Sequence, residues 1–113
     1  MHELSLCESI LEVLEQQAKQ QQFYTVKSVC LEIGKLSCVE VDALRFCFAS
    51  VMQNSLAESA ALDIIEIDGK AWCEHCQKTV TILQRYDECL QCGAYSLKIT
   101  DGEQMRIKEL EVL

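Results

Sequence analysis

Two pairs of cysteines constrain this chain more than any other feature. The first pair is Cys73 and Cys76, and the second pair is Cys89 and Cys92. A gap of two residues lets one tight turn aim both sulfur atoms at a single ion, and Zn²⁺ favours a closed tetrahedral shell of four thiolates. The spacing therefore predicts a structural zinc site formed by two short loops.

The residues that follow each pair affect how well the loops can close. A turn around a metal ion commonly requires positive φ after the second cysteine, and glycine tolerates that conformation best. Gly93 holds this place after the second pair, whereas Gln77 holds it after the first. We expect the first loop to be the less favourable of the two.

Disulfides are the competing interpretation of these cysteines. The chain opens Met-His-Glu, and we find neither a basic segment followed by an apolar run nor a long apolar stretch, so we expect neither export nor membrane insertion. Eight cysteines in such a chain indicate a reducing cytoplasm, and zinc is then favoured over disulfides.

Charge argues against a nucleic-acid partner, although zinc loops often bind nucleic acids. The 113 residues include 18 acidic and 10 basic side chains, for a net charge of −8. Phosphate binding requires concentrated positive charge, and no cluster of Lys or Arg occurs in the sequence.

Apolar periodicity predicts two amphipathic helices. The first runs from Ser5 to about Gln20, and its start is an S-x-x-E capping box formed by Ser5 and Glu8. The second helix begins at the same motif, formed by Ser37 and Glu40. Alternating or β-branched runs predict strands in five places, at 26–33, 62–67, 79–82, 95–99 and 105–112.

These elements predict an α+β fold in which two helices pack on a three-stranded sheet. A small β domain of zinc-ribbon type, holding the four-cysteine zinc site, is inserted before the last strand of that sheet. We expect residues 1–69 together with 102–113 to form the main domain, and residues 70–101 to form the inserted zinc-binding domain. Gly69 and Gly102 are the expected exit and return points.

The N-terminus offers a second set of metal ligands. The α-amine of Met1, the backbone amide of His2 and its imidazole would close adjacent chelate rings around one ion, and such nitrogen ligands suit Ni(II) or Cu(II). Glu3 or Glu40 could fill a further position. The alternatives are that His2 is a frayed terminal residue, that Glu3 only favours the positive end of the first helix, and that Glu40 only completes its capping box.

Other reactive side chains have simpler interpretations. We expect Cys7 and Cys47 to be small core residues, His75 to be solvated, and Cys38 to have a lowered pKa beside a helix start. The sequence lacks a glycine-rich phosphate loop, a nucleophile elbow and paired acids, so we do not expect an enzyme.

Three segments resemble the HypA/HybF family of nickel-incorporation proteins in [NiFe]-hydrogenase maturation. They are the opening Met-His-Glu-Leu-Ser-Leu-Cys, the run Leu-Glu-Ile-Gly at 31–34 followed by Leu-Ser-Cys-Val-Glu at 36–40, and the two CxxC pairs. The resemblance implies a nickel-binding domain, with nickel at Met1, His2 and Glu3, and structural zinc at the four cysteines. In some relatives an acidic residue equivalent to Glu40 lies near the nickel site.

The resemblance also implies a function and partners. The chain would be a nickel metallochaperone that carries Ni(II) to the precursor of the hydrogenase large subunit, assisted by the maturation GTPase, and it could form a homodimer. The alternative is a zinc-ribbon protein-interaction module without a nickel role. Thiol redox chemistry at a CxxC pair is a weaker third interpretation.

Overall fold

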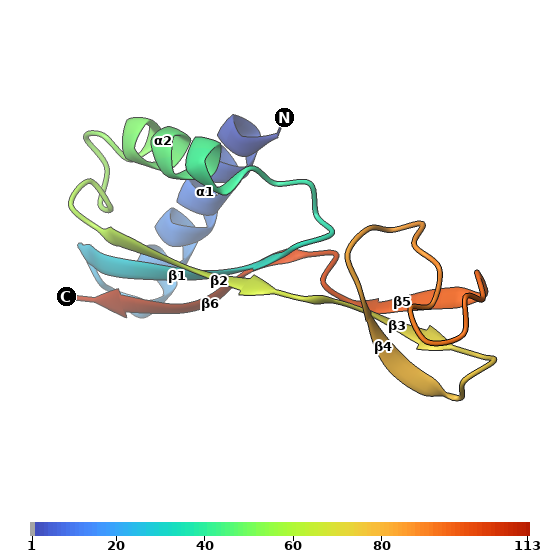
Figure 1. Ribbon diagram of the computed structural model, residues 1–113. Helices are drawn as coiled ribbons and strands as arrows, with labels where there is room; N and C mark the ends of the chain where they lie inside the picture. The colour runs from blue at the N-terminus through green and yellow to red at the C-terminus, as the bar shows by residue number, and fades with distance from the viewer. Residues whose placement is uncertain (1) are drawn as a thin grey trace. The chain divides into compact units, whose positions relative to one another are not determined.

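The computed structural model describes residues 2–113. In this part of the chain the elements follow one another in the order α1 (Glu3–Gln21), β1 (Val26–Gly34), α2 (Val41–Val51), β2 (Ala61–Ile67), β3 (Gly69–Cys73), β4 (Lys78–Ile82), β5 (Leu97–Asp101) and β6 (Met105–Val112) (Figure 1). The strands form two separate three-stranded sheets. The predicted α+β class, with two helices and a small four-cysteine domain, is confirmed.

The start of α1 lies upstream of its predicted capping box. The helix begins at Glu3, and the N–H of Leu6 donates to the carbonyl oxygen of His2 at 2.8 Å. Ser5 is therefore already inside the first turn, whereas a capping residue needs a non-helical backbone. The predicted start at Ser5 and Glu8 is wrong for this reason.

The start of α2 differs from the prediction in the opposite direction. Glu40 is the N-cap residue in an extended conformation, and the helix begins at Val41. Ser37 lies in the turn that follows β1, where its N–H donates to the carbonyl oxygen of Gly34 at 3.0 Å. The second predicted capping box is therefore also wrong, because Ser37 is used by the turn and not by the helix.

The first sheet has the strand order β2-β1-β6, and both helices cover one of its faces (Figure 1). β6 runs antiparallel to β1, because Leu113 donates to the carbonyl oxygen of Thr25 at one end and Gly34 donates to that of Gln104 at the other, both at 2.9 Å. The carboxyl ends of β1 and β2 lie together, so these two strands are parallel, and α2 is the crossover between them.

The core under the helices uses the apolar stripes that the sequence predicts. Its largest fully buried side chains from the helices and β1 are Cys7, Leu14, Val26, Val29, Leu31 and Leu44. Neither α1 nor α2, the helices of residues 2–113, combines the length and the apolarity that a membrane crossing needs.

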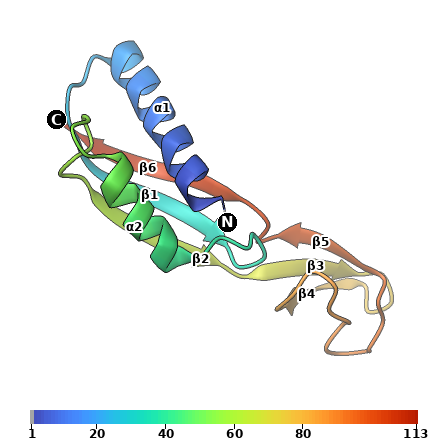
Figure 2. The same cartoon turned by 90° about the horizontal axis from the view of Figure 1, so that it is seen from above.

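The second sheet has the order β4-β3-β5, and Figure 2 shows β3 between its two neighbours. Both pairings are antiparallel, with Cys73 opposite Lys78 in β4 and opposite Leu97 in β5. The sequence pattern did not predict β3. Its residues include a glycine and an alanine, so its extended conformation is stabilised by pairing on both sides and not by intrinsic propensity.

Two compact units divide the described residues. The first comprises the described part of Met1–Leu31 with Val39–Ile64 and Ile107–Leu113, and the second comprises Glu32–Cys38 with Ile65–Arg106. The second unit is larger than the inserted segment expected at 70–101, since it also takes in the end of β1 and the turn after it. The assignment of the two domains to nickel and to zinc stays a prediction.

Three glycines of the second unit allow its backbone segments to approach one another closely. A Cβ atom on Gly34 would lie 2.0 Å from the carbonyl oxygen of Gly102, and one on Gly102 would lie 2.7 Å from that of Asp68. A Cβ on Gly69 would lie 2.8 Å from the carbonyl oxygen of Ile82. Because the obstructing atoms belong to the backbone, no side-chain rotation can make room for a larger residue.

We therefore expect Gly34→Ala to lower the free energy of unfolding of the zinc-loaded protein by about 3 kcal/mol. Urea denaturation followed by circular dichroism measures this change. The matched control is Lys27→Thr at an exposed position of the same strand, which should change stability by no more than about 0.5 kcal/mol. Equal midpoints for Gly34→Ala and the unmodified protein would contradict the steric explanation.

Candidate metal centre

The structure brings the four paired cysteines together. The Sγ atoms of Cys73, Cys76, Cys89 and Cys92 all lie within 4.8 Å of one another. The distance is 3.7 Å between Cys73 and Cys92 and 3.8 Å between Cys76 and Cys89. A tetrahedron with Zn–S bonds of about 2.3 Å has edges of about 3.8 Å, whereas a disulfide needs about 2.05 Å. The four thiols are free, and their arrangement fits Zn²⁺.

Backbone hydrogen bonds shape both cysteine loops in the same way. The N–H of Gln77 donates to the carbonyl oxygen of Cys73 at 2.8 Å, and the N–H of Gly93 donates to that of Cys89 at 2.8 Å. The N–H of Cys76 also points to the sulfur of Cys73 at 3.4 Å. Gln77 has φ of 55° and Gly93 has φ of 75°, so both loops end in the left-handed conformation that the sequence predicts.

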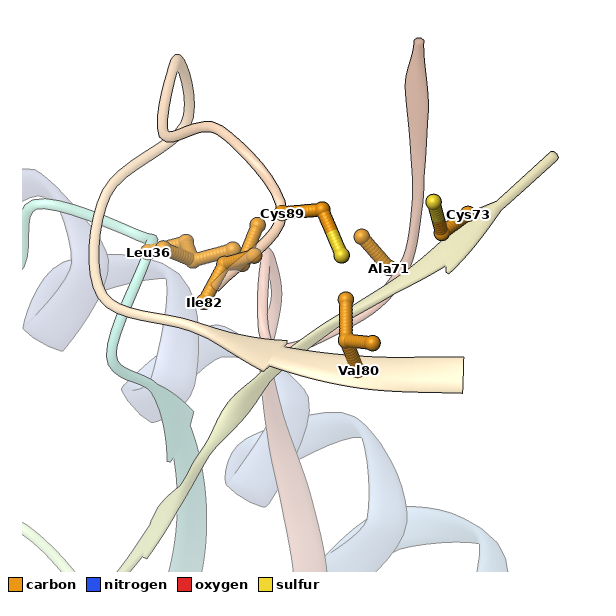
Figure 3. Packing of buried hydrophobic residues seen from close by; sticks show 6 residues of the cluster. All are labelled: Leu36, Ala71, Cys73, Val80, Ile82 and Cys89. Atoms are coloured by element: carbon orange, nitrogen blue, oxygen red, sulfur yellow. The ribbon is translucent and has the colours of Figure 1, made fainter. Parts of the chain in front are cut away.

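The centre lies on a small apolar core. Cys73 and Cys89 are buried, Cys76 is half-buried and Cys92 is exposed. The buried cysteines pack in one cluster with Leu36, Ala71, Val80 and Ile82 (Figure 3). No sequence pattern placed Leu36 in this core, because Leu36 lies far from the cysteines in the chain and belongs to the turn after β1.

The thiols of Cys89 and Cys76 differ in how readily they ionise. Hydrogen bonds from the N–H groups of Gln91 and Cys92 lower the pKa of the Cys89 thiol to about 7. The neighbouring sulfur of Cys92, together with burial, raises the pKa of Cys76 to about 12. The Cys89 thiolate is therefore available near neutral pH, and a bound divalent cation would supply the positive charge needed to deprotonate Cys76.

The residues expected to bind nickel lie at the start of α1, and Met1 lies outside the described residues. His2 is exposed and is the N-cap of α1. Glu3 is the one buried acidic or basic side chain of residues 2–113, with 8% of its surface exposed. Its Oε2 accepts a hydrogen bond from the N–H of Glu40 at 3.1 Å. The structure therefore brings Glu3 to the start of α2, beside the fourth residue of the expected nickel site.

This hydrogen bond also gives Glu3 a structural role that the sequence did not reveal. The N–H of Glu40 stabilises the ionised carboxylate and lowers the pKa of Glu3. Glu40 itself makes no side-chain capping bond with any described residue. The carboxylate that serves the start of α2 is therefore supplied by Glu3, from another helix.

The remaining candidates divide into core and surface residues. Cys7 is fully buried in the first unit, where its Sγ lies 3.6 Å from the carbonyl oxygen of Leu44, and burial raises its pKa to about 11. This fits the predicted core role. Cys38 is exposed with φ of 64° and lies two residues before the N-cap of α2, and its expected reactivity stays a prediction. His75 is exposed, as predicted.

Substitution of Gln77 tests the backbone conformation of the first loop. We expect Gln77→Gly to raise the free energy of unfolding by about 0.5–1 kcal/mol, because glycine adopts positive φ without a steric penalty. The reverse substitution, Gly93→Ala, is the control. Its Cβ would make only an ordinary contact, 3.8 Å from Oε2 of Glu88, but positive φ is required there too, so it should lower stability by about 1 kcal/mol. Urea denaturation with zinc bound measures both. A loss of stability in Gln77→Gly would contradict the explanation.

The pKa of Glu3 predicts a pH-dependent contribution to stability. Because its folded pKa lies below the ordinary value of 4.5, the contribution is fully present at neutral pH and is lost as the pH falls through the folded pKa. The difference in unfolding free energy between the unmodified protein and Glu3→Gln should therefore shrink below pH 4.5. Urea midpoints over a pH series measure it. Glu8→Gln, at an exposed position of α1, is the control, and identical pH profiles for the two variants would refute the role of Glu3.

Comparison with known proteins agrees with the geometry. Residues 1–112 match the family model described as "Hydrogenase/urease nickel incorporation, metallochaperone, hypA". Proteins named hydrogenase maturation factor HypA from Azotobacter chroococcum and Azotobacter vinelandii are 55% and 51% identical to this chain, over 99% of both chains in each case.

A solved structure shares the fold along the whole chain. It is the solution structure of the Ni metallochaperone HypA from Helicobacter pylori, with a TM-score of 0.73 and 29% sequence identity. The match covers 100% of this chain and 98% of the other. The resemblance drawn from three sequence segments is confirmed, and this chain belongs to the HypA family.

Proposed function

We propose that this protein is a nickel metallochaperone that binds Ni(II) at its N-terminus and delivers it to the precursor of the [NiFe]-hydrogenase large subunit. The observation that carries this proposal is the match to the nickel-incorporation family over residues 1–112. The relatives at 55% and 51% identity carry the name hydrogenase maturation factor, which supports hydrogenase as the recipient. Nothing in these comparisons favours a zinc-ribbon interaction module without a nickel role.

The proposed nickel ligands are the α-amine of Met1, the backbone amide and imidazole of His2, and the carboxylate of Glu3. Three nitrogen ligands close together in the chain suit the tetragonal geometry of Ni(II). The hydrogen bond from the N–H of Glu40 to Oε2 of Glu3 supports this set, because a fixed second partner orients a ligating carboxylate. Burial of Glu3 gives the start of α1 a fixed position from which His2 extends into solvent.

Glu40 is the proposed neighbour of the nickel site. Its backbone, one hydrogen bond away from Glu3, supports this placement. A side chain at the edge of an incompletely filled shell suits a carrier, because a ligand from the recipient must enter before the last ligand of the carrier leaves. We hold Glu40 to be an exchangeable ligand or a partner of the incoming group.

We propose structural Zn²⁺ at Cys73, Cys76, Cys89 and Cys92, where four thiolates would complete a closed shell. The Sγ–Sγ distances of 3.7 Å between Cys73 and Cys92 and 3.8 Å between Cys76 and Cys89 support zinc at this place. The two sites would then select different metals by their donor atoms, because nitrogen donors bind the transported nickel and sulfur donors bind the structural zinc.

The proposed setting is the reducing cytoplasm, where thiols stay available for zinc. The proposed partners are the GTPase of hydrogenase maturation and the large-subunit precursor, and the protein acts on them as a carrier without catalysing a reaction. Membership in a family named for nickel incorporation supports this setting within the hydrogenase maturation machinery.

Extension of the chain before Met1 is the decisive test of the N-terminal site. Two added residues convert the α-amine to an amide, which removes its basic lone pair and breaks the first chelate ring. We expect nickel affinity, measured by isothermal titration, to fall more than about tenfold, or about 1.4 kcal/mol, while zinc content stays unchanged. Unaltered nickel affinity in the extended protein would refute the proposed ligand set.

The two histidines of the chain provide a matched pair for the same titration. His2→Ala removes a proposed ligand and should weaken nickel binding by the same margin. His75→Ala removes an exposed histidine from a cysteine loop and should leave nickel affinity unchanged. An equal effect of both substitutions would instead place nickel at the cysteine centre.

A further inference from the structure

The outer edge of β5 is an open sheet edge in the four-cysteine unit. β5 pairs with β3 on one side, with Leu97 opposite Cys73 and Ile99 opposite Ala71, and no other strand within residues 2–113 pairs with it. In an antiparallel pair, every second residue points its N–H and C=O away from the neighbouring strand. The outer edge therefore presents backbone donors and acceptors to any extended chain that approaches it.

The pairing of β5 with β3 is regular over Leu97–Ile99. A bulge occurs opposite the step between Lys70 and Ala71, which places the irregularity at Thr100. Bulges are one of the devices that block pairing at a sheet edge, and Leu97–Ile99 lie outside this one.

A groove of about 540 Å³ lies beside the same strand. One wall consists of Tyr95 and the β5 residues Leu97 and Ile99, which are two residues apart and so point to the same side of the strand. The loop before the second cysteine pair adds Arg85, Tyr86 and Asp87 to the lining, and Glu103 completes it. A strand paired with the edge would direct alternate side chains into this groove.

Two tyrosines at the groove are almost fully exposed. Tyr86 is 91% and Tyr95 is 75% exposed, although both rings are largely apolar. Tyrosine is enriched among the residues that dominate binding energy at protein interfaces, because it contributes a large contact area with few rotatable bonds. Leu83 and Leu90 of the same loop region are also exposed.

The charges around the groove favour a basic occupant. The guanidinium of Arg85 forms an ion pair with Glu103, so the one positive side chain of the groove lining is already neutralised. Asp87 is held in place, because its Oδ2 accepts the N–H groups of Leu83 and Gln84, both at 3.0 Å. Two carboxylates against one guanidinium leave the lining with a net charge of −1.

We propose that the outer edge of β5 binds an extended segment of a partner protein by strand addition. The segment carries apolar side chains at alternate positions, which contact Tyr86, Tyr95 and Leu97, and a basic side chain that lies next to Asp87. In this mode the main-chain hydrogen bonds supply affinity, and the groove supplies selectivity. The proposal does not rest on nickel binding, since every residue involved belongs to the four-cysteine unit.

A designed peptide tests the proposal with the zinc-loaded, nickel-free protein. The probe is acetyl-Val-Thr-Val-Thr-Lys-Thr-amide, in which the two valines and the lysine share one face of the extended chain and can enter the groove together. One matched control replaces the lysine with glutamate, and the other N-methylates alternate backbone nitrogens without changing any side chain. We expect the probe to shift the amide signals of residues 97–101 in nitrogen-15 NMR spectra, and each control peptide to bind at least about tenfold more weakly.

Variants of the protein locate the binding surface. Tyr86→Ala and Tyr95→Ala should each weaken probe binding by about three- to tenfold, in keeping with loss of an interface tyrosine. Tyr24→Ala is the matched control, because Tyr24 is 85% exposed but belongs to the first unit, and it should bind the probe normally. Zinc content measured for each variant confirms that the unit remains folded.

Several outcomes would overturn the proposal. Absence of any shift at residues 97–101 at millimolar peptide, equal binding of the N-methylated peptide, or shifts confined to β4 would each exclude strand addition at β5. Shifts at residues 97–101 that appear on raising the protein concentration without peptide would identify a second copy of this chain as the occupant instead.

Discussion

The convergence of four sulfur atoms is the constraint on which the second unit depends. Its buried apolar side chains, apart from the cysteines themselves, are few and include Leu36, Ala71, Val80 and Ile82. A core of this size cannot offset the conformational entropy of so many ordered residues. Metal binding by zinc peptides contributes about 10–16 kcal/mol, which is enough to make folding favourable. The hydrogen-bonded loops then serve mainly to hold the sulfur atoms at the corners of a tetrahedron.

A single buried carboxylate, that of Glu3, orders the start of the first helix. The first residues of a domain are usually poorly ordered, which would be costly for a metal site built from them. Glu3 counters this tendency, because its carboxylate is buried and accepts the N–H of Glu40. The N-terminal turn of α1 is therefore linked to α2, and an exposed His2 extends from a fixed base. Glu3, itself a proposed nickel ligand, thus contributes to the fold and to the proposed site together.

The two proposed sites separate two metals through their donor atoms. Thiolates in a closed shell would retain zinc as part of the structure, whereas the proposed nitrogen donors of the first two residues could release nickel to a recipient. The open β5 edge lies in the unit that holds the sulfur centre. In this arrangement, recognition of a partner and release of the cargo involve different residues, so each can change without loss of the other.

Patterns that act over a few residues were sufficient to predict most of the structure from the sequence. Apolar periodicity predicted α1, α2 and five of the six strands close to their observed positions, and cysteine spacing predicted the metal centre, because chelation by a tight turn is a local property. The positive φ angles at Gly93 and Gln77 were predicted for the same reason, because they belong to the two tight turns.

Tertiary structure alone decided the features that join distant segments. Neither predicted capping motif is used, because Ser5 lies inside the first turn of α1 and Ser37 belongs to the turn after β1. The carboxylate at the start of α2 comes instead from Glu3 of another helix. β3 has weak propensity and becomes a strand only through its two neighbours. The contact between Gly34 and Gly102 is likewise invisible in the sequence. Hydrogen bonds and steric exclusion between residues far apart in the chain arise only after folding has placed them together, and no local pattern encodes them.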